Sequence, residues 1–319
     1  MPNTFSKQLI CTLIRYEQPL ALLGLWYLSS TLFCLAMSTL CGLRSYFLAL
    51  VFPSDNYRRY GRWAVVMIEQ NTLSYHYAEE LAKKHMDIKL IGSTGDNDAL
   101  KKFAEYLQDT YGIEAEVLTS DLDKNSRNML DCIRDKIEKL ESIGILVNQL
   151  PRRPIPSPHV QTSDCELTEQ ISAMVLTAHL SKIVISKMAA QHSGAVINIS
   201  DPSGDYPHPY LAAHSASCAY MDYFARSLNW ELACDNIRVQ SLVPYDSITT
   251  DEERCTWGSI RPSLVARHAV NSLSKARSRG YWLYELKGFL AKCIPLYFRQ
   301  YWTYKMNKPD CGCRLMLKE

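Results

Sequence analysis

The sequence has little net charge and lacks any block of lysines or arginines interleaved with aromatic side chains, as a nucleic-acid surface would require. The formal charge is +2 over 319 residues, so we expect no nucleic-acid partner. The 11 cysteines are an odd number scattered through apolar runs, which argues against a disulfide framework and favours a reduced compartment. Internal repeats and low-complexity tracts are also absent from the sequence. One α/β domain with appendages is the simplest organisation for this length.

Charge is missing altogether from residues 20–43, an uncharged run of 24 positions. A helix of that length can cross roughly 30 Å of hydrocarbon, and we interpret the run as a spanning or deeply embedded helix. A cleaved signal peptide is disfavoured because the run is long and begins only at residue 20, and a buried core helix is disfavoured by length. More arginines follow the run than basic residues precede it, so the positive-inside rule places the main domain on the cytosolic side.

A second segment of interest, 281–304, is crowded with aromatic side chains but interrupted by four charged residues. These charges argue against a span, whereas aromatic rings beside lysine and arginine suit the headgroup level of a bilayer. An interfacial helix pair is one interpretation, and rings that cover a pocket or form a protein interface are the other. Beyond this segment, Cys311 and Cys313 have no two further ligands nearby, so we predict no metal site there.

Between these ends, short apolar and β-branched runs alternate with segments of helical spacing. The runs lie at 63–68, 88–93, 115–120, 144–149, 194–200 and 237–244. Because parallel strands need crossover connections, the alternation predicts a Rossmann-type, doubly wound parallel sheet with helices on both faces. The predicted divisions are an N-terminal tail at 1–19, a membrane anchor at 20–52, the Rossmann-type domain at 53–250 and a C-terminal lobe with a membrane-facing tail at 251–319.

Glycine is absent from residues 67–74, the loop that follows the first predicted strand. A dinucleotide-binding loop needs glycines there, because they let the backbone approach the pyrophosphate at the next helix N-terminus. Glu69 also puts a negative charge where the phosphates would lie. The loop therefore predicts poor dinucleotide binding.

Several segments, in this order, resemble the short-chain dehydrogenase/reductases: YGRWAVV, YAEELA, GILVN, GAVINIS, LAAHSASCAYMDYFARSL and IRVQSLVP. The front end with LALLGLWY and a closing GYW narrow the resemblance to the branch of 17β-hydroxysteroid dehydrogenases and very-long-chain 3-oxoacyl-CoA reductases, and within it to the inactive hydroxysteroid dehydrogenase-like proteins. The similarity covers roughly residues 18–305. For active members, it implies ketone reduction by hydride transfer from NAD(P)H.

This resemblance implies three catalytic positions: a tyrosine that protonates the substrate oxygen, a lysine that lowers the pKa of that tyrosine, and a serine that polarises the carbonyl. They hold His214, Cys218 and Asp201 in this sequence, with Gly204 retained after the serine position. A neutral thiol lacks the fixed charge of lysine, and an ionised carboxylate cannot donate a hydrogen bond. A fourth family residue, an asparagine that orders a relay water, falls at Val175. We expect no catalytic residue.

The resemblance also places the cofactor positions. The glycine loop becomes the stretch that includes Ile68, Glu69, Thr72 and Ser74, and the Asn-Asn-Ala-Gly motif becomes Asn148, Gln149, Leu150 and Pro151. Asp121, at the position that contacts the adenine in the family, still matches. We therefore expect no cofactor, or NADP(H) if any dinucleotide binding remains.

Positions 201, 214 and 218 converge in this fold, so the new residues form a carboxylate, imidazole and thiol cluster that would in principle suit a nucleophile or a metal. The alternative is a drifted site in which a histidine bonds a carboxylate and a cysteine fills space. We favour the drifted site and predict no metal, because the sequence offers no oxyanion hole, fourth ligand or water-activating residue.

Two function hypotheses follow. The first is a membrane-attached pseudoenzyme that binds a lipid or sterol, in a pocket roofed by residues 251–304, or a protein partner. The second is a residual NADP(H)-dependent oxidoreductase acting on steroids or long-chain 3-oxoacyl-CoA. The resemblance also implies a homodimer formed through the helix that starts at His214 and the helix before it. It suggests the endoplasmic reticulum or the mitochondrion, and no motif decides between them.

Overall fold

The computed structural model describes residues 17–33, 36–37, 40, 57–68, 73–92, 97–118, 127–245, 260–271, 273 and 276–308. The chain divides into two compact units, Met1–Phe52 and Pro53–Glu319. The larger unit contains both the predicted Rossmann-type domain and the predicted C-terminal lobe. It holds all the strands and helices discussed below, apart from the helical residues of the N-terminal unit.

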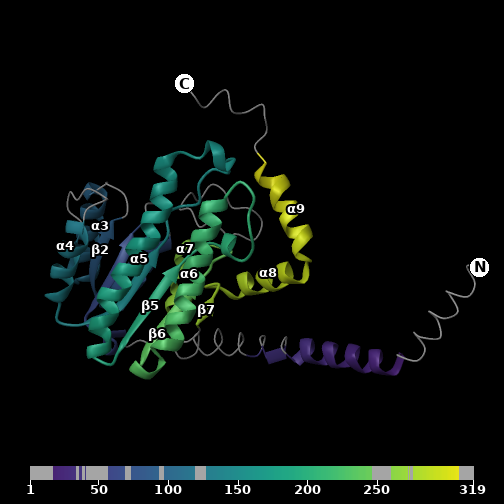
Figure 1. Cartoon of the computed structure of the whole chain (residues 1–319). Helices are drawn as coiled ribbons and strands as arrows, with labels where there is room; N and C mark the ends of the chain where they lie inside the picture. The colour runs from purple at the N-terminus through teal and green to yellow at the C-terminus, as the bar shows by residue number, and fades with distance from the viewer. Residues whose placement is uncertain are drawn as a thin grey trace, which may run out of the picture. The chain divides into compact units, whose positions relative to one another are not determined.

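A seven-stranded parallel sheet forms the centre of the larger unit, in the order β3-β2-β1-β4-β5-β6-β7 (Figure 1). The strands are β1 (Trp63–Ile68), β2 (Asp87–Gly92), β3 (Ala115–Val117), β4 (Ile143–Gln149), β5 (Gly194–Ile199), β6 (Ile237–Leu242) and β7 (Arg277–Ser278). The strand order reverses between β1 and β4, which is the switch point at which ligands bind in this class of sheet.

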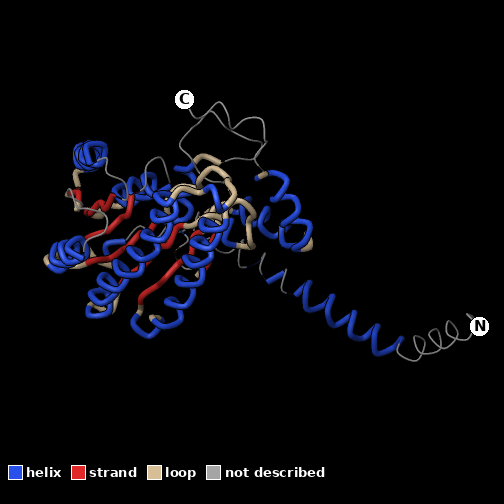
Figure 2. The backbone as a smooth tube through the Cα atoms, turned by 45° about the horizontal axis from the view of Figure 1, so that its top comes forward, coloured by secondary structure: helices blue, strands red, loops and turns tan. Residues whose placement is uncertain are grey.

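Helices cover both faces of the sheet, and Figure 2 shows the strands lying between them. The helices are α2 (Leu73–Lys83), α3 (Asn97–Tyr111), α4 (Arg127–Glu138), α5 (Asp164–Ala190), α6 (Ala212–Glu231), α7 (Pro262–Asn271), α8 (Trp282–Cys293) and α9 (Leu296–Asn307), and short 3₁₀ turns include η2 (His159–Gln161) and η3 (Pro202–Gly204). The layers are α2 with α3 and α7 on one side, and α4 with α5 and α6 on the other. The predicted Rossmann-type fold is confirmed.

The buried strands explain why the sequence shows continuous apolar runs rather than alternation. On β1, Val66 packs into the core with Tyr77 of α2, whereas its neighbour Val65 packs with Ile133 of α4 and Leu180 of α5. All five side chains are fully buried. Since both faces of a parallel strand are covered by helices, every position along it favours an apolar residue.

In the N-terminal unit, residues 17–33 are helical. Large apolar side chains are exposed along them, with Leu22 and Phe33 at 67% and Trp26 at 69%. Within the part of the chain that the structure describes, α5 is the one helix long and apolar enough to cross a membrane by length and composition. It packs against β4, β5, α4 and α6. One face, with Leu180, Val184 and Met188, belongs to the core of the larger unit, whereas Ile171 and Val175 are exposed.

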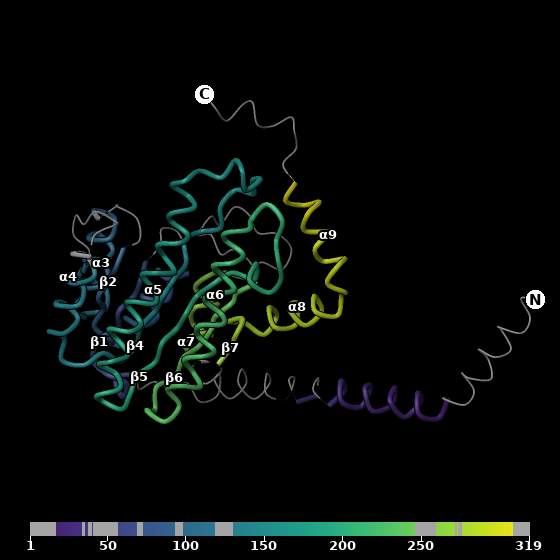
Figure 3. The backbone as a smooth tube through the Cα atoms, in the orientation of Figure 1, coloured from purple at the N-terminus to yellow at the C-terminus, as the bar shows by residue number. Residues whose placement is uncertain are grey.

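The C-terminal helices α8 and α9 follow one another along the chain (Figure 3). They carry many exposed large side chains. The exposed aromatic residues are Trp282, Phe289, Tyr297, Phe298, Tyr301, Trp302 and Tyr304. Hydrogen bonds hold α9 to two loops of the Rossmann-type domain: Arg153 Nη2 donates to Asn307 Oδ1 (3.2 Å), Asn307 Nδ2 donates to the Pro209 carbonyl (3.1 Å), and the Tyr206 and Thr303 hydroxyls pair at 3.1 Å. We call the exposed aromatic face of the two helices the α8–α9 surface.

Candidate functional site

The site lies beyond the carboxyl end of β5, where the chain enters η3 and then α6. Asp201 caps η3, because its Oδ1 accepts hydrogen bonds from the backbone N–H of Ser203 (2.8 Å) and from the Ser203 hydroxyl. His214 lies in the first turn of α6 and Cys218 follows four residues later, so both side chains project from one face of the helix. The loop after β5 and the start of α6 thus bring the three side chains together.

The distances define a compact cluster. His214 Nε2 lies 3.5 Å from Cys218 Sγ and 3.9 Å from Asp201 Oδ1, and the ligand atoms of all three residues lie within 4.8 Å of one another. The other ring nitrogen, Nδ1, lies 3.4 Å from Oε1 of Gln170 on α5. Cys218 is fully buried and His214 is 2% exposed. We call Asp201, His214 and Cys218 the cluster.

Burial sets the protonation of this cluster. It lowers the pKa of His214, against the opposing effect of Asp201, so the imidazole is neutral near pH 7. Burial also raises the pKa of Cys218, and the charge of Asp201 raises it further, so the thiol keeps its proton. Since the thiolate is the nucleophilic form of cysteine, the cluster is not a thiol nucleophile.

Cys218 is therefore expected to resist alkylation in the folded chain. At pH 8, iodoacetamide should modify the exposed Cys165, Cys234 and Cys293 more than about a hundredfold faster than Cys218, whose thiol is both buried and protonated. Peptide mass spectrometry over a time course measures each rate separately. In urea, the rates should converge. Folded-state alkylation of Cys218 at the rate of Cys165 would contradict the protonation argument.

Acid is expected to destabilise the fold through the buried histidines near the site. Burial and the charge of Arg153 lower the pKa of His208 to about 4, and the pKa of His214 is lowered as well. The unfolded chain takes up these protons near pH 6.5, so the free energy of unfolding should fall as the pH drops from about 6.5 to 4. We expect a loss of about 2 kcal/mol from His208, after allowing for solvent screening of a partly exposed ring.

Chemical unfolding of the full chain at several pH values measures this loss. His208→Gln should flatten the dependence, because the variant has no proton to gain there. His159→Gln, a substitution at an exposed histidine of η2, should leave it unchanged. An equal slope in the parent and His208→Gln would show that the acid sensitivity arises elsewhere.

The predicted relay position on α5 lies outside the buried face of that helix. Val175 is 50% exposed and does not face the cluster. The buried face of α5 instead carries Gln170, Ala173 and Thr177, spaced three and four residues apart. Ala173 shares a small buried apolar cluster with Cys218, and a methyl group cannot order a relay water. The family resemblance did not indicate Ala173 or Gln170. Both lie on the buried face of α5, which the spacing of three and four residues along the helix would have indicated.

An apolar plug surrounds the thiol at the former lysine position. Leu150, Ala173, Cys218 and Met221 are all buried and belong to one apolar cluster, with Tyr220 packed against it. The Leu150 N–H donates to the Ile199 carbonyl at 3.4 Å, which holds the loop after β4 against β5. Where the family motif has a small residue, the branched side chain of Leu150 fills space beside Cys218. A lysine here would have to place its charge among these apolar groups.

The other predicted cofactor positions have structural roles where the structure describes them. Asn148 is fully buried and its Nδ2 donates to Ser181 Oγ (3.1 Å) and to Asn198 Oδ1 (2.9 Å), which ties β4 to α5 and β5. Ile68 and Ser74 are buried at the end of β1 and the start of α2. Glu69, Thr72 and Asp121 lie outside the described residues.

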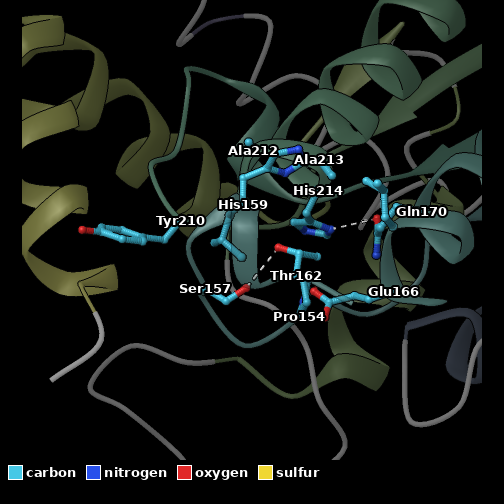
Figure 4. Close-up of a pocket in the computed structure, with 12 residues that line it drawn as sticks. Pro154, Ser157, His159, Thr162, Glu166, Gln170, Tyr210, Ala212, Ala213 and His214 are labelled. Carbon is cyan, nitrogen blue, oxygen red and sulfur yellow. Dashed lines mark hydrogen bonds between the residues drawn. The ribbon is translucent and has the colours of Figure 1, made fainter. Parts of the chain in front are cut away.

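A small pocket of about 60 Å³ lies beside the cluster, between η2, the start of α5 and the start of α6. Figure 4 shows His214 and Gln170 pointing toward one another at its wall, with Ser157 and Thr162 also paired. Sites for drug-sized ligands are typically roughly 300–1,000 Å³. This pocket therefore suits water or a small polar group rather than a sterol, and the predicted roof of residues 251–304 lies partly outside the described residues.

Comparison with known proteins gives a consistent set of relatives. The family profile described as short chain dehydrogenase matches residues 62–254. A Homo sapiens protein named inactive hydroxysteroid dehydrogenase-like protein 1 is 33% identical over 302 residues, covering 92% of this chain and 89% of that protein. The Bos taurus very-long-chain 3-oxoacyl-CoA reductase is 29% identical over 248 residues, covering 75% of this chain and 78% of the reductase.

A solved structure extends the likeness at the level of the fold. The short-chain dehydrogenase from Sphingobium yanoikuyae in complex with NADPH aligns with a TM-score of 0.59 and 20% sequence identity, covering 73% of this chain and 96% of that one. That protein binds NADPH on the same type of sheet. The likeness shows a shared fold.

Proposed function

The chain belongs to the short-chain dehydrogenase family, as the sequence predicts, and from this premise we propose that it is a catalytically inactive, membrane-associated member that acts by binding. The observation that carries the proposal is the rewritten site, in which Asp201, His214 and Cys218 replace the three catalytic residue types and Leu150 fills the space beside them. Fold alone does not imply activity, because function depends on the site.

The rewritten site cannot perform the proton transfer that ketone reduction needs. A neutral His214 has its Nδ1 directed at Gln170 and its Nε2 at the Cys218 thiol, so neither nitrogen is presented to a substrate oxygen. The Asp201 carboxylate accepts hydrogen bonds from Ser203 instead of donating one. No fixed positive charge stands at position 218 to lower the pKa of a proton donor.

The most direct test is equilibrium binding of NADPH and NADH to the detergent-solubilised full chain, by calorimetry up to millimolar concentrations. We expect no saturable binding, and a catalytically competent short-chain dehydrogenase in the same detergent serves as the positive control. Saturable binding by this chain would favour the residual NADP(H)-dependent oxidoreductase acting on steroids or long-chain 3-oxoacyl-CoA. Ketone-reduction assays of His214→Tyr and Cys218→Lys variants would then follow.

Membrane attachment is the second part of the proposal. The uncharged run at 20–43 would embed in the bilayer, and the α8–α9 surface would lie at the headgroup level of the endoplasmic reticulum or the mitochondrion, with the main domain facing the cytosol. Exposed rings such as Tyr297 (72%) and Trp302 (67%) support this, with the basic Arg299 between them. Lipid or sterol contacts would form on this surface, and contact with a protein partner is the competing use of the same rings. A homodimer would form through α6 and α5.

Photo-crosslinking of the full chain in liposomes tests the orientation. A photoreactive phenylalanine analogue at Tyr297 should form lipid adducts, whereas the same group at Tyr223, a tyrosine of similar exposure (66%) on α6, should form few. Equal lipid yields at both positions would contradict a lipid-facing α8–α9 surface. Protein adducts at Tyr297 in place of lipid adducts would favour a partner or a second copy of this chain.

A further inference from the structure

We propose that Asp201, His214 and Cys218 form a binding site for a divalent cation of the zinc class. Zinc bonds of about 2.0–2.3 Å place neighbouring tetrahedral ligand atoms about 3.3–3.8 Å apart. The separations of 3.5 Å between His214 Nε2 and Cys218 Sγ and of 3.9 Å between Nε2 and Asp201 Oδ1 are close to these edges. Small side-chain shifts would bring the three atoms onto one ion.

The orientation of the imidazole is the second observation. Gln170 Oε1 can only accept, so the contact at 3.4 Å makes Nδ1 the donor and leaves a lone pair on Nε2. That lone pair faces Cys218 Sγ. Histidines that bind metals usually donate their other N–H to an oxygen in this way, which fixes the tautomer. Gln170 is 3% exposed and is held on the long α5 helix.

Charge balance also favours a dication. The Asp201 carboxylate contributes one negative charge, and the Cys218 thiol contributes a second when its proton leaves to solvent as the metal–sulfur bond forms. One bound dication then makes the buried cluster neutral and releases one proton. The charge of Arg153 and a protonated His208 are the nearby groups that oppose the ion. A thiolate ligand selects zinc-class ions over magnesium or calcium.

The surroundings complete the arrangement. Ser203 donates from its backbone N–H and its hydroxyl to Asp201 Oδ1, which holds the carboxylate in place. These two bonds occupy both lone pairs of Oδ1, so the hydroxyl would turn away as the ion binds. The Asp201 side chain keeps 14% exposure, so an ion and a water as the fourth ligand would enter from the Asp201 side. The sequence alone predicts no metal for want of a fourth protein ligand, and the distances and Gln170 change that conclusion.

Cobalt is the probe for the test, because a thiolate bound to Co²⁺ gives a charge-transfer absorption. Chelator-treated full chain in detergent, titrated with Co²⁺, should show this band at one ion per chain, and Zn²⁺ should displace it. Cys218→Ser should abolish the band, whereas Cys165→Ser, a matched change at an exposed cysteine of α5, should retain it. Gln170→Leu should weaken binding about 10–100-fold by removing the support of His214.

Absence of saturable cobalt binding would overturn the proposal, as would an unchanged band in Cys218→Ser. If Cys218→Ser melts well below the parent, Gln170→Leu decides, because it leaves all three ligands in place: unchanged affinity overturns the site and the expected weakening supports it. The result is independent of the NADPH titration, so failure of this site and failure of the inactive-enzyme proposal are distinguishable.

Discussion

Gly204→Ala is expected to lower the melting temperature of the full chain by about 6–12 °C, corresponding to about 3 kcal/mol of overpacking. A Cβ at Gly204 would lie 2.7 Å from the backbone nitrogen of Ala219 and 2.7 Å from the carbonyl carbon of Cys218. These are backbone atoms of α6, so they cannot rotate away. The close contact between η3 and α6 therefore needs glycine whether or not the chain catalyses a reaction.

Gly112→Ala is the matched control for this change. A Cβ there meets no atom within 4 Å, but the residue has φ of +64°, so alanine should cost about 1–2 kcal/mol from backbone strain alone. Thermal unfolding followed by circular dichroism compares the two variants. A shift for Gly204→Ala no larger than that for Gly112→Ala would show that η3 and α6 can separate at little cost.

Asp205→Asn is expected to destabilise the fold by about 3–5 kcal/mol, because it leaves the buried Arg279 guanidinium without its counter-charge, whereas Arg277 keeps Asp222 as a partner. Asp205 accepts hydrogen bonds from Arg279 Nη2 at 2.6 Å and from Arg277. Burial by itself would raise the pKa of Asp205, but these two arginines outweigh it and hold the pKa below its ordinary value. This contribution is present above the unfolded pKa near 4 and is lost as the pH falls through the lower folded pKa.

Two further variants distinguish two effects on stability: leaving a buried charge unpaired, and removing a carboxylate from any position. Asp131→Asn removes an exposed partner of Arg134 at 3.8 Å and should cost less than about 0.5 kcal/mol. Adding Arg279→Met to Asp205→Asn removes the unpaired charge, so the double variant should recover part of the loss. Additive destabilisation in urea unfolding would contradict direct pairing of Asp205 with Arg279.

Much of the fold could be predicted because buried parallel strands give continuous apolar runs. The predicted runs at 63–68 and 194–200 correspond to β1 and β5, and the latter strand ends at Ile199. In the predicted run at 115–120, residues Ala115–Val117 form β3, an edge strand paired with β2 alone, and residues 119–120 lie outside the described residues. The two-residue β7 has a polar sequence and no period, so no pattern could indicate it.

The residue types of the site were readable from the sequence, but their partners were not. Position alone placed His214 and Cys218 on one helix face, since side chains four apart on a helix are neighbours. The contact of His214 with Gln170 joins residues 44 apart in the sequence, and the packing of Leu150 on Cys218 depends on the path of a proline-rich loop. Such contacts are set by tertiary packing and leave no local pattern.

The hydrogen bonds that join α9 to the Rossmann-type domain couple any movement of α9 to two loops of that domain. Arg153 and Pro209, which bond Asn307, belong to the loops that follow β4 and β5, and the Tyr206 hydroxyl meets Thr303 one turn earlier on α9. Any occupant that displaced α9 would have to move these loops or break the bonds. If moving these loops changed the affinity of the cluster for a ligand, linkage would require that ligand to change the affinity of α9 for its occupant by the same free energy.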